Sequence, residues 1–111
     1  MNIKQFIKNN PYLFWDTWNE NLSDEVILAR TIDFWDLDQL RQLYKIMWED
    51  RFKKAFVNNL LDKNGQVRQQ ININDYKLIY ILAHSLWLEN EIPLWDIISR
   101  AKKTSFYNLK N

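Results

Sequence analysis

Glycine and proline are scarce in this chain, which has one glycine and two prolines in 111 residues. These residues are the strongest local punctuation of secondary structure, because glycine adopts conformations that end elements and proline cannot continue a helix. A chain with so few of them is expected to form long elements joined by short connections. The composition therefore favours an all-α fold, and we predict one domain over residues 1–111, a compact bundle of about five helices.

Capping residues predict where the first helices begin. A short helix is expected over residues 2–8, ending before Asn10-Pro11 because the residue before proline avoids the helical region. Ser23 is a predicted N-cap of a second helix, and Asp36 is a predicted N-cap of a third, since a helical apolar pattern follows each. The pattern after Asp36 continues to about Leu61, and residues 52–61 form either a fourth helix or a continuation of the third after a kink near residues 48–50.

The middle of the chain carries a turn signal. Residues 62–65 read Asp-Lys-Asn-Gly, and Gly65 can take the positive φ that ends a helix. Apolar residues alternate from Val67 to Ile73, a pattern compatible with a short strand that has no evident partner. We therefore expect a turn followed by a segment with little helical character.

Two further helices are predicted in the last third. Asn74 is expected to cap a helix over residues 75–89, and Pro93 to open a last helix that runs to about Lys103. Residues 104–111 are expected to fray. The side chains of the first of these helices that we expect to face inward are Leu78, Ile79, Ile81, Leu82 and Leu86.

Tryptophan is unusually frequent, with six residues. Three of them stand between a bulky apolar residue and an aspartate, in Phe14-Trp15-Asp16, Phe34-Trp35-Asp36 and Leu94-Trp95-Asp96. A buried aromatic ring removes roughly 150 to 250 Å² from water, so we expect most tryptophans to lie in the core. Trp18 and Trp95 are the best candidates for partial exposure, where tryptophan often dominates binding energy.

Residues with catalytic or metal-binding chemistry are few. His84 is the only histidine and there is no cysteine, so the ligands of a typical structural zinc site are missing. One glycine cannot build a phosphate-binding loop, and no nucleophile motif is present. The sequence predicts a protein that is not an enzyme, with no catalytic residues, no cofactor and no metal.

The sequence also bears on location. There is no long apolar run and no signal-like start, so we expect a protein that neither spans a membrane nor is secreted. The absence of cysteine is compatible with a reducing compartment. A cytoplasmic protein is expected.

The net charge of +1 conceals an uneven distribution. Seven acids but only one base, Arg30, lie between positions 16 and 38, whereas residues 100–111 contain four bases and no acid. The acidic stretch is either a solvated helix face or a docking surface for a charged partner. The basic stretch permits an alternative function as a small DNA-binding regulator, with backbone contacts from Arg100, Lys102, Lys103 and Lys110.

The segments Pro11–Asp16, Ile27–Phe34 and Asp36–Tyr44 together resemble a family of small bacterial proteins. Its members open with a Phe-Trp-Asp motif, carry an arginine-containing helix and are often encoded beside AbiEii-type nucleotidyltransferase toxins. The resemblance covers about residues 11–88. Where the family pattern has glycines, this chain has Trp35 and Trp48.

The resemblance implies an all-helical, antitoxin-like protein that acts by binding a protein partner, such as a nucleotidyltransferase toxin or a defence enzyme. A phage-encoded inhibitor of a defence enzyme has the same sequence properties and remains a second alternative. The motif positions carried over are Phe14, Trp15, Asp16 and Arg30. Trp18 and the neighbouring acids complete the predicted partner-binding set, which is Phe14, Trp15, Asp16, Trp18, Arg30, Asp33, Asp36 and Asp38.

Overall fold

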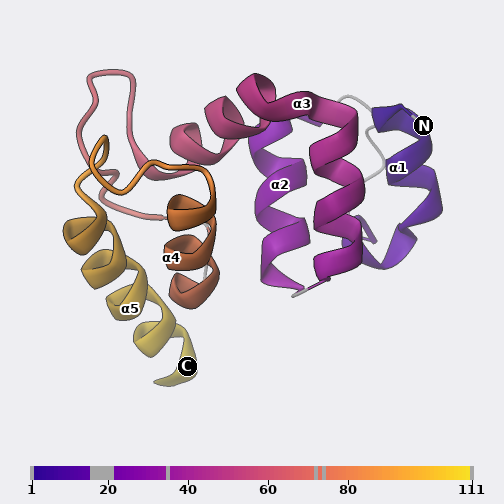
Figure 1. Ribbon diagram of the computed structural model, residues 1–111. Coiled ribbons are helices and arrows are strands. Elements are labelled where there is room, and N and C mark those ends of the chain that lie inside the picture. Colours follow the sequence, from indigo (N-terminus) through magenta and orange to yellow (C-terminus); the bar gives the residue numbers. More distant parts are fainter. Residues whose placement is uncertain (1, 16–21, 35, 72, 74, 111) are drawn as a thin grey trace. The chain divides into compact units, whose positions relative to one another are not determined.

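The computed structural model describes residues 2–15, 22–34, 36–71, 73 and 75–110, and for residues 103–110 it describes the backbone. The described chain is all-α, which confirms the predicted fold class (Figure 1). Its elements are α1 (Ile3–Asn9), the 3-10 turn η1 (Pro11–Leu13), α2 (Asp24–Asp33), α3 (Leu37–Leu60), α4 (Tyr76–Ser85) and α5 (Leu94–Lys110). None of the described helices is long and apolar enough to cross a membrane.

The chain divides into two compact units, Met1–Phe56 and Val57–Asn111. In unit 1, residues 1–56, the buried apolar side chains come from α1, η1 and the residue after it, α2 and α3. They are Phe6, Leu13, Phe14, Ile27, Leu28, Ala29, Ile32, Leu40, Leu43, Met47, Phe52, Ala55 and Phe56. The expectation of a single domain over residues 1–111 stays a prediction.

Side-chain caps begin the helices of unit 1, and those at Ser23 and Asp36 are predicted from the sequence. Asn2 accepts from the backbone N–H of Gln5 at 2.9 Å, and the Gln5 side chain accepts from the Asn2 backbone at 3.0 Å, a reciprocal capping box. Ser23 caps α2 through the N–H of Val26, and Asp36 caps α3 through the N–H of Gln39. Each cap satisfies a backbone donor that has no partner within its helix.

The predicted break in the third helix is present as a sharp bend at Trp48 within α3 (Figure 1). Residues 44 and 52 would lie about 12 Å apart along a straight helix axis. The ring centroids of Tyr44 and Phe52 are 5.2 Å apart in an edge-to-face contact. The bend brings these rings together, and Phe52 is buried.

Unit 2, residues 57–111, begins with the end of α3 and the predicted turn. Gly65 has φ +79° and donates to the Asp62 carbonyl at 3.0 Å, while the Asp62 side chain accepts from the N–H groups of Asn64 and Gln66. The segment that follows contains no strand within the described residues. A single antiparallel bridge joins Leu61 and Val67, and Ile71 and Ile73 are buried without a sheet to pair with.

The helix α4 is shorter than predicted. Asp75 is its N-cap, accepting from the Leu78 N–H at 3.1 Å, and the predicted cap Asn74 lies outside the described residues. The helix ends at Ser85 rather than near Glu89, because a turn through Trp87 closes it. The prediction that Ile81 faces inward is wrong, since its side chain is 49% exposed, whereas Leu78, Ile79 and Leu86 are buried and Leu82 is half-buried.

The last helix is longer than predicted. Pro93 precedes its first residue and accepts from the Ile97 N–H at 3.1 Å, and α5 continues to Lys110 instead of fraying after Lys103. It runs antiparallel to α4 and packs against it (Figure 1). Their contact buries an apolar stripe of α5 that consists of Leu94, Ile97, Ile98 and Ala101.

Candidate interaction surface: the exposed tryptophans

The predicted motif Phe14-Trp15-Asp16 contains one buried and one exposed residue among those described. Phe14 is buried and packs edge-on against Phe6, with 6.3 Å between ring centroids. Trp15 is 76% exposed. Phe14 is therefore a core residue, and Trp15 is accessible to a partner. Asp16 and Trp18 lie outside the described residues.

Arg30 has a structural contact. It is half-buried on α2, and its Nη1 donates to the carbonyl oxygen of Leu13 at 3.1 Å, which ties α2 to η1. A charged donor on a backbone carbonyl is among the stronger hydrogen bonds in proteins. This contact orients the segment that presents Trp15.

The predicted acidic residues occupy different environments. Asp33 is the last residue of α2 and is half-buried, and Asp38 is exposed in the first turn of α3. Asp36, besides capping α3, accepts a hydrogen bond from the Tyr12 hydroxyl. That hydrogen bond, assisted by burial and by the charge of Asp36, raises the pKa of Tyr12 to about 12. Asp36 thus fixes η1 to the start of α3.

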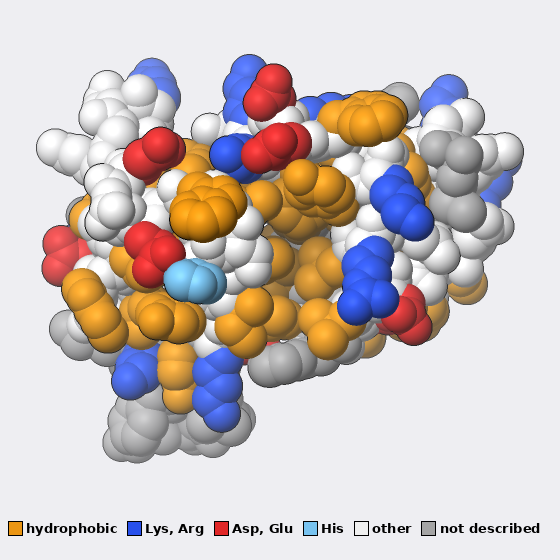
Figure 2. Space-filling model, viewed as in Figure 1, with side chains coloured by type: hydrophobic (Ala, Val, Ile, Leu, Met, Phe, Trp, Pro, Cys, Tyr) orange, Lys and Arg blue, Asp and Glu red, His pale blue; other side chains and the backbone are white. Residues whose placement is uncertain are grey.

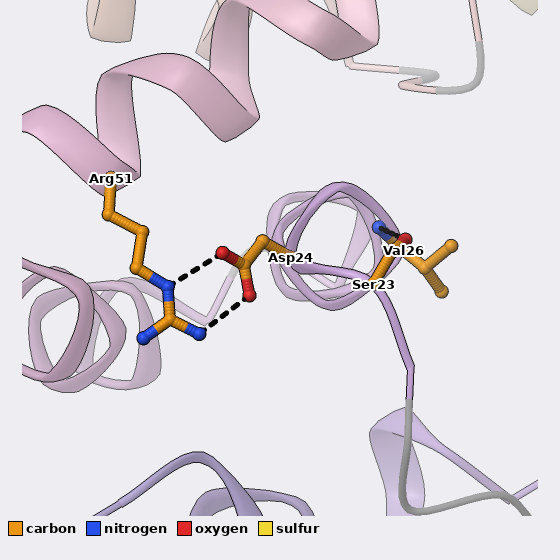
Figure 3. A network of polar contacts seen from close by, with 4 residues as sticks. All are labelled: Ser23, Asp24, Val26 and Arg51. Atoms are coloured by element: carbon orange, nitrogen blue, oxygen red, sulfur yellow. Dashed lines mark hydrogen bonds and ion pairs between the residues drawn. The ribbon is translucent and has the colours of Figure 1, made fainter.

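An ion pair in unit 1 joins two positions that no local sequence pattern relates. Arg51 donates through Nε and Nη2 to the two carboxylate oxygens of Asp24, at 2.6 and 2.8 Å (Figure 3). Asp24 lies in the first turn of α2 beside the N-cap Ser23, and Arg51 lies on α3 after the bend. The hydrogen bond to Asp24 raises the pKa of Arg51. The two parallel hydrogen bonds of this fork make it a geometrically specific polar contact between α2 and α3.

The tryptophans contradict the core expectation. Every described tryptophan side chain is highly exposed, at 76% for Trp15, Trp48 and Trp95 and 81% for Trp87. Of the two candidates for exposure, Trp95 is confirmed, and Trp18 lies outside the described residues. Phenylalanine and aliphatic side chains fill the interior of unit 1 instead, and the buried apolar side chains described in unit 2 are aliphatic. Exposed tryptophans on separate elements are therefore the main surface feature of the described chain, and Figure 2 shows large hydrophobic side chains on the visible surface.

Trp48 stands in a backbone conformation that normally belongs to glycine. Its φ is 65° and its ψ is 169°, inside a helix whose other residues are helical. A residue with a Cβ in this region carries a strain on the order of 1 to 3 kcal/mol. The bend of α3 is therefore made at a residue that does not favour it, and the side chain of that residue lies in solvent.

Trp87 is in the left-handed region for a different reason. Its N–H donates to the His84 carbonyl at 3.1 Å, and the N–H of Leu88 donates to the Ala83 carbonyl at 2.8 Å. These two bonds form a Schellman motif at the end of α4, whose central position usually holds glycine. Trp87 occupies that position with φ 61°. No local sequence signal predicts this site, because such helix ends are recognised by a glycine, which is missing here.

The basic residues of the alternative DNA-binding site all fall on α5. Arg100 donates to the carbonyl of Arg68 at 3.3 Å, and the Lys102 ammonium lies over the ring of Tyr76, 5.1 Å from its centroid. Lys103 and Lys110 belong to the part of α5 for which the backbone alone is described. Two of the four predicted phosphate contacts thus already have neighbours within unit 2.

His84 is an exposed residue near the end of α4. Its Nδ1 lies 2.5 Å from a carboxylate oxygen of Glu89, in the loop after the Schellman motif. Within the described residues, no three histidine, aspartate or glutamate side chains come close enough to share a metal ion. The pair is a local contact between a helix and the loop that follows it.

Comparison of the chain with protein-family models, with characterised proteins and with solved structures finds no match.

Proposed function

We propose that this protein is a non-enzymatic protein-binding module, an antitoxin-like or regulatory partner of a bacterial toxin or defence enzyme in the cytoplasm. A nucleotidyltransferase toxin is the partner that the sequence resemblance favours. The observation that carries the proposal is the exposure of Trp15, Trp48, Trp87 and Trp95, each at least 76% accessible. Tryptophan is among the residue types most enriched at binding hot spots.

The backbone at two of these residues strengthens the argument. Trp48 and Trp87 have positive φ, and a bulky residue in that region destabilises the fold. Glycine would relieve the strain at both positions. A side chain that is costly to the fold and does not pack in the core is explained if it contributes to binding.

The bend at Trp48 also supports the antitoxin-like assignment. In the family pattern that the sequence resembles, position 48 is a glycine. The φ of 65° and ψ of 169° at Trp48 are values that glycine adopts readily. A backbone bend that suits glycine, with an exposed tryptophan side chain added to it, accounts for this departure from the pattern.

The acidic residues of unit 1 favour a partner with a basic surface. Asp38 is exposed in the first turn of α3, in the stretch where acids outnumber bases. A toxin that acts on nucleotides or RNA presents a basic cleft, and opposite charges accelerate association at low salt. Of the predicted acids, Asp38 is the one that we propose contacts such a cleft directly.

The test is capture of a partner by the tagged full-length protein from extracts of its host, after nuclease treatment. The comparison variant carries Trp15→Ala, Trp48→Ala, Trp87→Ala and Trp95→Ala. We expect the wild type to retain a stoichiometric protein and this variant to lose it, by tenfold or more, since each hot spot contributes about 2 kcal/mol or more. A matched control with Lys45→Ala and Lys54→Ala, both exposed, should retain it.

Thermal unfolding must accompany the capture, because the loss is informative only if the tryptophan variant stays folded. Undiminished capture by the tryptophan variant would contradict the proposal. Retention of nuclease-sensitive DNA that is lost after Arg100→Glu, Lys102→Glu and Lys103→Glu would instead favour the DNA-binding alternative. A captured enzyme of a phage-defence system would favour the alternative of a phage-encoded inhibitor.

A further inference from the structure

The outer face of α4 and α5 in unit 2 contains a groove lined by apolar and aromatic side chains. Its volume is about 410 Å³, and it is lined by Tyr76, Lys77, Tyr80, Ile81, Trp95, Ile98 and Lys102. On α5, Trp95, Ile98 and Lys102 follow one another at helical intervals along a single face. The groove lies over the α4 and α5 pair, where Figure 2 shows hydrophobic side chains with basic side chains beside them.

A second hollow begins where this groove ends. It has a volume of about 390 Å³ and is lined by Tyr80, Glu89, Asn90, Ile92, Pro93, Leu94, Trp95 and Asp96. Tyr80 and Trp95 line both hollows and so form the ridge between them. The two hollows are therefore neighbouring halves of one surface of unit 2.

The charged residues of the two halves have opposite signs. Lys77 and Lys102 are the charged residues of the first half, and Glu89 and Asp96 are those of the second. The Lys102 ammonium lies over the Tyr76 ring, which holds this charge at the groove. A ligand along both halves meets positive charge, then the aromatic ridge, then negative charge.

We propose that the two halves bind one segment of a partner protein that is apolar in its middle, acidic at one end and basic at the other. This inference rests on the proposed protein-binding function and names the surface and the chemistry of the partner. Trp95 is the expected anchor, because it is exposed and reaches both halves. Its neighbours Tyr80 and Ile81 are also exposed, and they give the apolar middle of the segment a surface to cover.

The charge order favours a protein segment over a nucleic acid. Aromatic residues and lysines together can stack bases and hold phosphates, as single-strand binding surfaces do. A phosphate backbone that followed both halves would meet Glu89 and Asp96, which repel it. A peptide can match both signs.

The test uses three labelled peptides with the same amphipathic centre of leucine and tryptophan. The first has glutamates at one end and lysines at the other, the second has lysines at both ends, and the third has glutamates at both ends. Fluorescence anisotropy with the full chain should show tightest binding of the first, by about tenfold, because two exposed ion pairs separate it from each of the others. Trp95→Ala should weaken its binding by roughly 30-fold.

Charge reversal provides the sharper comparison. The variant Lys77→Glu/Lys102→Glu makes both halves acidic, so the preferred peptide should become the one with lysines at both ends. Reversal of two exposed lysines of unit 1, Lys45→Glu/Lys54→Glu, is the matched control and should keep the original preference. Melting temperatures of all variants establish that they are folded.

Three results would overturn the inference: equal binding of the three peptides, no binding of any, or an unchanged preference in Lys77→Glu/Lys102→Glu. Binding of a labelled oligothymidine that this variant loses would also overturn it and assign the groove to nucleic acid. The proposed function fails separately, when no captured partner depends on the exposed tryptophans. Capture that is lost with Trp15→Ala and Trp48→Ala but kept with Trp95→Ala would support the function and refute the groove.

Discussion

Trp48 in unit 1 and Trp87 in unit 2 have nearly the same φ and nearly the same exposure, but different backbone settings. Trp87 ends a helix, where a left-handed residue lets two backbone N–H groups reach the carbonyls of Ala83 and His84. Trp48 interrupts a helix, with ψ 169° and helical residues on both sides. A left-handed residue is ordinary at a helix end and unusual in a helix interior, so the strain at Trp48 should be the larger.

Of the exposed tryptophans, Trp48 should show the largest difference in stability between its alanine and glycine variants. Alanine keeps the Cβ that is unfavourable at φ 65° and ψ 169°, whereas glycine adopts these values freely. We expect Trp48→Gly to be more stable than Trp48→Ala by about 2 kcal/mol in urea unfolding. If alanine is the more stable of the two, the bend is not maintained and α3 straightens through this position.

At Trp87 we also expect the glycine variant to be more stable than the alanine variant, but by a smaller difference in free energy of unfolding. The left-handed region costs a residue with a Cβ about 1 to 2 kcal/mol, and the greater freedom of glycine in the unfolded chain offsets part of this gain. Trp87→Gly should therefore exceed Trp87→Ala by about 1 kcal/mol in the free energy of unfolding. Equal stability of the two variants would show that the Schellman motif is not formed in solution.

At Trp95 we expect the opposite order, with the glycine variant less stable than the alanine variant. Trp95 is as exposed as Trp48 but lies in the first turn of α5. Glycine destabilises a helical position relative to alanine by about 0.5 to 1 kcal/mol. Trp95→Gly should accordingly be the less stable of its pair, measured by thermal unfolding. A gain with glycine here, at a helical position, would mean that the difference between glycine and alanine at Trp48 and Trp87 does not report relief of backbone strain.

The tryptophan variants separate effects on stability from effects on partner binding. All these positions are exposed, so the loss of the indole itself should change stability by about 0.5 kcal/mol or less, apart from backbone effects. The same small change in stability is expected for Trp15→Ala. If Trp15 were buried in the core, this replacement would destabilise the protein by about 3 to 5 kcal/mol. Binding measurements on the same variants then report the contribution of each indole.

Much of the fold follows from local sequence signals. Ser23 and Asp36 cap the helices that their positions predict, and the bend occurs in the interval 48–50, which was one of the two alternatives for that stretch. Gly65 makes the predicted turn. These features depend on residues within a few positions of each other, where hydrogen bonding and steric limits act directly.

The candidate surface was predicted less well. The motif residue Phe14 is in the core, and Asp36 is engaged by Tyr12, so neither is an open contact for a partner. Ile81 was expected inside and instead lines the groove on α4. Hydrophobic periodicity predicts which face of a helix is buried. It does not predict how wide the buried face is, because that depends on how much of it the neighbouring helix covers.

The sequence by itself determined the all-α class, the helix starts and the positions of the turns, because scarce glycine and proline and local caps leave few other choices. Only the tertiary structure decided which aromatic residues are buried. Four phenylalanines lie in the core of unit 1, whereas Trp15, Trp48, Trp87 and Trp95 remain in solvent. Burial depends on contacts between distant elements, such as the packing of α5 on α4, and no local pattern encodes those contacts.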